Sequence, residues 1–173
     1  MSAGSREPSM TSVSPEPTPI VGVEPHVRLE MKSQPRYLSG ARDMVSAIAR
    51  RLGFHDGECG QIALAVDEAL CNVIRHGYDR APDKPIWVSL WPYEIDGEAR
   101  GIQIVIEDEA RQVDTDEIRG RELEDVRPGG LGVYIIRQVM DYCGFEKRDG
   151  VGMRLTLIKL SSEESVESCE EME

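Results

Sequence analysis

The chain has 173 residues, of which 40% are hydrophobic, and a formal net charge of -12. This length suits one domain with a real core, and the negative charge disfavours nonspecific binding to nucleic acid or to an anionic membrane. No apolar run approaches the roughly 18 residues that span a bilayer, and the N-terminus lacks the apolar core of a signal peptide. The four cysteines form no C-x-x-C pair and have no metal-like spacing with the three histidines. We therefore expect a cytoplasmic protein with reduced thiols and no zinc site.

Both ends of the chain have compositions that cannot build a core. Residues 1–25 hold five of the ten prolines and five serines, which predicts a disordered N-terminal extension. Residues 161–173, SSEESVESCEEME, hold six acidic residues and no basic one. They predict a solvated, disordered tail, with an interaction tail as the alternative. The folded domain is expected over residues 26–160.

The first half of the domain reads as a strand followed by two helices. Residues 26–32, HVRLEMK, alternate as in a half-buried strand. Residues 36–52 carry apolar side chains at helical spacing, and Gly53 follows as a stop signal. A second helix is expected from about residue 59 to His76, with Gly77 as its C-cap.

The second half predicts four strands and one helix. Strands are expected at residues 85–93 and 101–108, followed by a polar loop over residues 108–130 and a third helix over residues 131–141. Residues 142–160 read as a hairpin that turns near Asp149 and Gly150. This order predicts a two-layer α/β sandwich, in which a mixed or antiparallel sheet is covered on one face by about three helices.

The second helix carries Glu68, Asn72 and His76 at steps of four, so the three side chains lie along one helix face. A solvated face with a capping histidine is one interpretation. The other is a magnesium site, because magnesium takes hard oxygen ligands and an asparagine oxygen supplies one. A carboxylate one turn earlier could orient or deprotonate a nucleophile.

The segment RPGGLG, residues 127–132, places three glycines directly before the third helix. Glycines let the backbone approach a phosphate, and a helix start adds unpaired N–H groups and a positive dipole end. A plain turn is the alternative. About twenty residues separate Asp108 from Gly129, which argues against a dinucleotide fold, and a Walker-type lysine is absent.

The combination is more informative than its parts. An E-x-x-x-N-x-x-x-H-x-Y helix, a strand ending in Asp, a long loop and G-G-x-G before a helix resemble the GHKL ATP-binding superfamily, with its Bergerat fold. The small size, the RPGGLG segment and the lack of a phosphoacceptor helix pair make the chain similar to the anti-sigma factor serine/threonine kinases. The resemblance covers about Leu29 to Lys159.

The resemblance implies ATP and Mg²⁺ as cofactors and a role for each matched residue. Glu68 would be the general base towards a substrate serine, and Asn72 would hold the metal. His76 and Tyr78 would shape the end of the site, and Asp108 would accept a hydrogen bond from the adenine amino group. The residues implied along the phosphates are Gly129, Gly130, Leu131 and Gly132.

The loop over residues 113–128 would act as a lid over ATP. Arg127 lies in it just before the glycines and would neutralise charge on the transferred phosphate. Arg119 and Arg121 lie further back in the same loop. Each of the three could equally be an ordinary solvated arginine.

Two departures from the family pattern fall on the adenine side. The motif D-x-G-x-G is here DEARQ, with Ala110 and Gln112 in place of glycines, and alanine loses access to positive φ. The last strand has Gly152-Met153 where Gly-Thr is usual, and Thr156 cannot substitute because three steps along a strand reverse the face. We therefore hypothesise that ATP binds more weakly, or with less base selectivity, than in related proteins.

The resemblance implies an ATP-dependent serine/threonine kinase of the partner-switching type. It would phosphorylate a serine of an antagonist protein, hold a sigma factor or similar regulator in its other state, and form a homodimer. The alternative is a non-catalytic module that sequesters a partner and has a weakened or lost nucleotide site. Ala110 and Met153 favour that alternative, whereas Glu68 argues against it.

Overall fold

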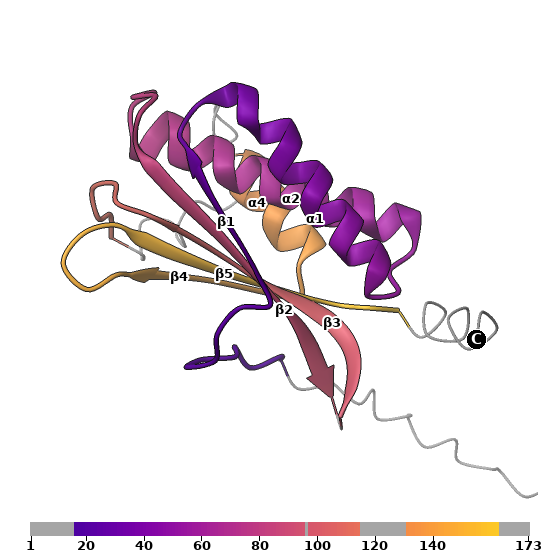
Figure 1. Cartoon of the computed structure of the whole chain (residues 1–173). Helices are drawn as coiled ribbons and strands as arrows, with labels where there is room; N and C mark the ends of the chain where they lie inside the picture. The colour runs from indigo at the N-terminus through magenta and orange to yellow at the C-terminus, as the bar shows by residue number, and fades with distance from the viewer. Residues whose placement is uncertain (1–15, 96, 115–130, 163–173) are drawn as a thin grey trace, which may run out of the picture.

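The computed structural model describes residues 16–95, 97–114 and 131–162 (Figure 1). The elements follow the predicted order of strand, two helices, two strands, helix and two strands. They are β1 (Val27–Lys32), α1 (Leu38–Arg51), α2 (Asp56–Asn72), β2 (Pro85–Ile95), β3 (Glu98–Asp108), α4 (Leu131–Val139), β4 (Tyr142–Lys147) and β5 (Met153–Leu160). None of the helices in these ranges is long and apolar enough to cross a membrane.

The five strands form one sheet in the order β1-β2-β3-β5-β4, and every pairing is antiparallel. Of the two expected kinds of sheet, the antiparallel one is therefore correct. Figure 1 shows α1, α2 and α4 together on one side of the sheet. The predicted two-layer α/β sandwich is confirmed, and the predicted hairpin is the β4–β5 pair.

The core lies between the helices and one face of the sheet. Strand residues alternate in and out of this layer, because successive side chains point to opposite faces. The buried side chains on the helix-facing side of the central strands are Ile86, Val88, Leu90, Ile102, Ile104, Ile106, Leu155 and Leu157. From α2, Ile62, Val66, Ala69 and Leu70 are buried against them. Burial of each large aliphatic side chain stabilises the fold by roughly 1.5–3 kcal/mol.

The two ends of α2 differ from the sequence prediction. The helix begins at Asp56, where the Glu58 carboxylate accepts a hydrogen bond of 2.9 Å from the His55 backbone N–H. At the other end it continues into a π-helical turn, Val73–Gly77. Positive φ occurs beyond it, at Asp79 and Arg80, and not at Gly77. The prediction of Gly77 as C-cap is therefore wrong, because the wider π-turn carries the chain past it.

The sheet face without helices carries the N-terminal segment, drawn in indigo below the strands in Figure 1. Gln103 of β3 is fully buried there, and its amide donates to Ile20 O (3.0 Å) and accepts from Ile20 N (2.6 Å). The Tyr93 hydroxyl pairs with both backbone groups of Thr18, and the Trp91 indole donates to Val23 O. The predicted disordered extension comprised residues 1–25. Residues 16–25 form this contact, and residues 1–15 lie outside the described part.

Candidate functional site

The start of α4 lies directly against the polar face of α2. A Cβ added to Gly132 would come 2.7 Å from Glu68 Oε2 and 3.3 Å from Asn72 Nδ2. No side chain fits in that space unless Glu68 or Asn72 moves. Three residues predicted from separate motifs, Glu68, Asn72 and Gly132, therefore meet at one place.

Glu68 and Asn72 are half-buried, and Leu131, the first residue of α4, is exposed. A helix start presents unpaired N–H groups and a partial positive charge. Here that helix start lies beside a carboxylate and an amide oxygen. This arrangement can bind an anionic group and a cation side by side, which is what a phosphate with its metal ion requires.

The side-chain oxygens of Glu68 and Asn72 suit magnesium as ligands. Magnesium needs only one or two protein oxygens when phosphates and water complete the octahedron, and Glu68 and Asn72 offer such oxygens on the face of α2 beside Gly132. Within the described residues, no group of three or more His, Cys, Asp or Glu side chains could hold a metal on its own. A metal here would therefore depend on a ligand that brings oxygens of its own.

The π-helical turn connects the two halves of the site. A Cβ added to Gly77 would come 2.9 Å from the Cβ of Ala110, so the end of the turn touches the segment after β3. Ala110 is buried by this contact. His76 lies in the same turn with an exposed side chain. π-Turns within helices are frequent at functional sites.

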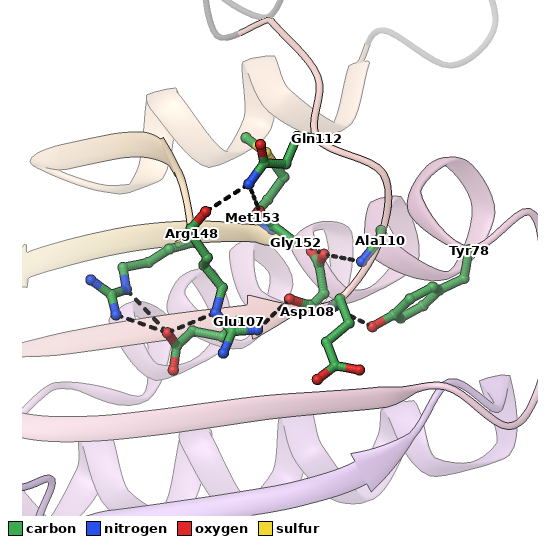
Figure 2. A network of polar contacts seen from close by, with 10 residues as sticks. Tyr78, Glu107, Asp108, Ala110, Gln112, Arg148, Gly152 and Met153 are labelled. Carbon is green, nitrogen blue, oxygen red and sulfur yellow. Dashed lines mark hydrogen bonds and ion pairs between the residues drawn. The ribbon is translucent and has the colours of Figure 1, made fainter. Parts of the chain in front are cut away.

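Asp108 ends β3 as a buried carboxylate (Figure 2). Its Oδ1 atom accepts hydrogen bonds from Ala110 N at 2.8 Å and Met153 N at 3.2 Å. Burial raises the pKa of Asp108, while these two backbone bonds and the charge of Arg148 oppose the rise. Both of these bonds go to Oδ1, so Oδ2 is the oxygen that can accept from a ligand.

The Tyr78 side chain bridges three segments around this carboxylate. Its hydroxyl donates to Pro85 O and accepts from Glu109 N, both at 2.6 Å. Burial raises the pKa of Tyr78, so the hydroxyl keeps the proton that it donates. Tyr78 thus ties the end of the α2 region to the beginning of β2 and to the residue after Asp108.

Gly152 allows the β4–β5 turn to lie close to the backbone of Asp108. Its φ is +93°, and a Cβ there would come 1.8 Å from the backbone oxygen of Asp108. Both observations exclude any other residue at this position. Met153, the next residue, contributes its backbone N–H to Asp108. Thr156 pairs with Val105 and lies on the opposite face of the sheet from Met153, as predicted.

The substitutions at Ala110 and Gln112 do not strain the loop. Among the described residues, positive φ outside glycine occurs only at Asp79 and Arg80. The segment after β3 therefore follows a path that ordinary residues adopt, and the loss of two glycines costs it no backbone strain.

A polar cluster beside Asp108 was not found from the sequence. Gln112 Nε2 donates to Arg148 O (2.6 Å) and to Gly152 O (3.3 Å), and Arg148 Nη1 donates to Asp108 O (2.6 Å). Figure 2 shows these contacts closing around the carboxylate. Arg148 also pairs with Glu107 at 3.4 Å and lies over the Trp87 ring. Residues 36–40 positions apart in sequence meet here, and no local pattern signals that.

Four predicted features lie outside the described residues: Arg127, Gly129, Gly130, and the lid from residue 115 onward, with Arg119 and Arg121. The predicted residues that the structure describes divide into two groups. Glu68, Asn72, Leu131 and Gly132 surround one half of the site, and Asp108, Ala110 and Met153 surround the other. The contact between Gly77 and Ala110 joins the halves.

Residues 31–159 match the family model described as a histidine kinase-like ATPase domain. The chain belongs to this family. The histidine kinase-like ATPase domain thus spans nearly all of the described fold, and it includes both halves of the site.

Relatives of this ATPase-domain chain include proteins named as protein kinases. Serine-protein kinase RsbW of Listeria monocytogenes serotype 4a (strain HCC23) is 30% identical over 145 residues, which cover 82% of this chain and 90% of that protein. The protein of the same name from Bacillus subtilis (strain 168) is 22% identical over 139 residues, covering 76% and 84%. A solved histidine kinase domain from the Erythrobacter litoralis EL346 blue-light activated histidine kinase aligns with a TM-score of 0.45 at 21% identity, over 76% of this chain and 63% of that chain.

Proposed function

We propose that this protein is an ATP-dependent serine/threonine protein kinase that acts as an anti-sigma factor in partner switching. It transfers the γ-phosphoryl group of ATP to a serine of an antagonist protein, and in its other state it holds a sigma factor or similar regulator. The observation that carries the proposal is the close packing of Gly132 against Glu68 and Asn72, where an added Cβ would lie 2.7 Å from Glu68 Oε2 and 3.3 Å from Asn72 Nδ2. The names of the Listeria and Bacillus relatives support it.

Glu68 acts as the general base in this proposal. It takes the proton of the substrate serine hydroxyl as the serine oxygen bonds to the γ-phosphorus, and the bond from that phosphorus to the β,γ-bridging oxygen breaks to leave ADP. Enzymes that transfer phosphoryl groups depend mainly on positioning and charge stabilisation. The start of α4, with Leu131, Gly132 and the preceding Gly129 and Gly130, binds the phosphates. Arg127 neutralises charge on the group in transfer.

Asn72 holds Mg²⁺ through its side-chain oxygen, and the metal supplies charge neutralisation at the phosphates. His76 borders the same end of the site. On the other side, Asp108 accepts from the adenine amino group, with Ala110 and Met153 fixing its carboxylate. ATP and Mg²⁺ are therefore the proposed cofactors.

The proposed partners are proteins, and the proposed assembly is a homodimer by analogy with the family. A cytoplasmic location is part of the proposal, because its partners belong to transcription. The three cysteines in the described ranges, Cys59, Cys71 and Cys143, are all unpaired thiols, which suits a reducing compartment.

The alternative, a sequestering module without catalysis, is less well supported. Its first argument was Ala110, which has no positive φ that would require glycine. Its second argument was Met153, whose backbone nevertheless bonds to Asp108.

Two measurements on the full chain test the proposal. Thermal unfolding with about 1 mM ATP and Mg²⁺ should show stabilisation of roughly 2.7 kcal/mol if the dissociation constant is about 10 μM, and Asn72→Ala should abolish it. Phosphotransfer to candidate antagonist proteins, read as phosphoserine by mass spectrometry, should be lost in Glu68→Gln with partner binding retained. Asp67→Asn is the matched control, since Asp67 is the adjacent carboxylate on α2 and pairs with Arg42 at 4.0 Å. No nucleotide stabilisation in the unmodified chain would contradict the proposal.

A further inference from the structure

The loop after β3 and the β4–β5 turn are joined by hydrogen bonds, with donors on both segments. From the loop, Gln112 Nε2 donates to two carbonyl oxygens of the turn, Arg148 O at 2.6 Å and Gly152 O at 3.3 Å. From the turn, Arg148 Nη1 donates back to Asp108 O at 2.6 Å. We call these three bonds the loop–turn clasp. Figure 2 shows it beside the Asp108 carboxylate.

The side chain of Arg148 is itself held firmly in place. Its guanidinium lies 3.4 Å from Glu107 Oε1 and 5.2 Å from the centroid of the Trp87 ring. Arg154 also donates to that Glu107 oxygen at 2.9 Å. Because the arginine is fixed by an ion pair and by an aromatic face, the turn that carries its carbonyl is a rigid anchor for Gln112.

The clasp controls the geometry of one carboxylate. Asp108 Oδ1 accepts from Ala110 N, which belongs to the loop, and from Met153 N, which follows the turn. The two donors come from the two segments that Gln112 joins. If the loop and the turn separate, the donors separate as well, and the carboxylate loses the orientation that directs Oδ2 at a ligand.

We propose that Gln112 is a positioning residue that sets base selectivity. Through the clasp it orients Asp108 to accept a hydrogen from the exocyclic amino group of a purine. This rests on the proposed function, in which Asp108 meets the base. Gln112 stands where the family pattern has a glycine. A glycine-rich turn fixes the path of the loop by its backbone conformation, and here the hydrogen bonds of the Gln112 side chain fix it instead.

The test compares ATP with inosine triphosphate, which has a carbonyl oxygen, an acceptor, at the position where ATP has the amino group that donates to Asp108. Dissociation constants for the full chain with Mg²⁺ are measured by calorimetry. A hydrogen bond to a charged group is worth about tenfold in affinity, so the unmodified chain should prefer ATP by about tenfold. In Gln112→Leu the preference should fall below about threefold, while the affinity for inosine triphosphate changes by less than about twofold.

Two further variants make the result decisive. Gln112→Glu keeps the shape but presents an acceptor to two carbonyl oxygens, so it should lose the preference at least as fully. Gln138→Leu, an exposed glutamine on α4, should leave both affinities unchanged. An unchanged preference in both Gln112 variants would overturn the inference, and so would equal weakening of both nucleotides. If the unmodified chain bound neither nucleotide, the proposed function would fail, and the inference with it.

Discussion

Gly132 and Glu68 are in contact across the interface between α4 and α2, with 2.7 Å between the position of an added Cβ and Glu68 Oε2. The atoms that a methyl group would meet are the ends of flexible side chains, so they can swing aside at small cost in stability. Gly132→Ala should therefore displace the proposed base and leave the fold intact. Phosphotransfer should fall on the order of 100-fold, as a misplacement of about 1 Å can cause, while the free energy of unfolding drops by no more than about 1–2 kcal/mol.

Gly60→Ala is the matched control for Gly132→Ala. Gly60 lies inside α2, and a Cβ there meets nothing within 4 Å. Alanine at such a site should stabilise the helix by roughly 0.5–1 kcal/mol and leave phosphotransfer unchanged. Urea unfolding and steady-state kinetics on both variants separate the two effects. If Gly132→Ala kept full activity, Glu68 would not be the base.

Asp108 should destabilise the fold when it is ionised. Burial raises its pKa in the folded state above the ordinary aspartate value, so the folded protein binds the proton more tightly than the unfolded chain. This contribution to stability is present below the unfolded pKa and is lost as the pH rises through the folded pKa. Asp108→Asn keeps an acceptor for Ala110 N and Met153 N, so at pH 7 it should unfold at the same or a higher urea concentration.

The gain in stability from Asp108→Asn should vanish below the unfolded pKa of Asp108, because the aspartate is then protonated in both the folded and the unfolded state. ATP binding should show the opposite dependence. It needs the ionised carboxylate as an acceptor, so affinity should fall as the pH drops through the raised pKa of Asp108, and Asp108→Asn should lose selectivity for ATP at every pH. Urea unfolding at several pH values between about 3 and 7, and calorimetry between about 4 and 7, check both. A variant less stable than the unmodified chain at pH 7 would contradict the first prediction.

Spacing within a single element was enough to predict much of the fold and one half of the site. Steps of four placed Glu68 and Asn72 on one face of α2, and alternation identified the strands. G-G-x-G before a helix predicted that the backbone would approach a phosphate, which stays a prediction, and the structure adds a close approach of Gly132 to α2. Each of these features depends on a local period that a sequence displays directly.

Contacts between distant segments were not predictable in the same way. The clasp joins Gln112 to residues 36 and 40 positions later, and Gln103 meets Ile20 across 83 positions. Proline and serine content predicted disorder for residues 1–25. Composition carries no information about a distant side chain such as Gln103, whose amide bonds to the backbone of Ile20. The C-cap at Gly77 was wrong for a related reason: Gly77 lies in a π-turn and against Ala110, a residue of a distant segment, and no local pattern signals either feature.

Substitutions at Gly152 and Gly150 distinguish the cost of backbone strain from the cost of a steric clash. Both glycines have positive φ, +93° and +85°, but only at Gly152 would a Cβ meet another atom, Asp108 O at 1.8 Å. Gly150→Ala should cost about 1–2 kcal/mol of unfolding free energy from strain alone. Gly152→Ala should cost at least twice as much and abolish ATP binding, since the backbone at Asp108 must move. Equal losses in urea unfolding would mean that the clash is relieved elsewhere.

The N-terminal segment over residues 16–25 should depend on Gln103 for its position. Gln103→Leu keeps the volume of this buried side chain but removes both bonds to Ile20. The N–H and C=O of Ile20 would then be buried without partners, each costing about 1–3 kcal/mol, so the segment should detach and become hydrated. Hydrogen exchange followed by mass spectrometry should show its amides exchanging at the rate of an unstructured peptide.

Two variants decide whether that release is specific. Tyr93→Phe removes only the two bonds to Thr18, so exchange should rise at Thr18 and less at Ile20, because Gln103 still holds the latter. Gln138→Leu on α4 should leave exchange in residues 16–25 unchanged. If Gln103→Leu left the segment protected, apolar packing of the half-buried Ile20 would be holding it, and the buried glutamine would contribute nothing beyond its volume.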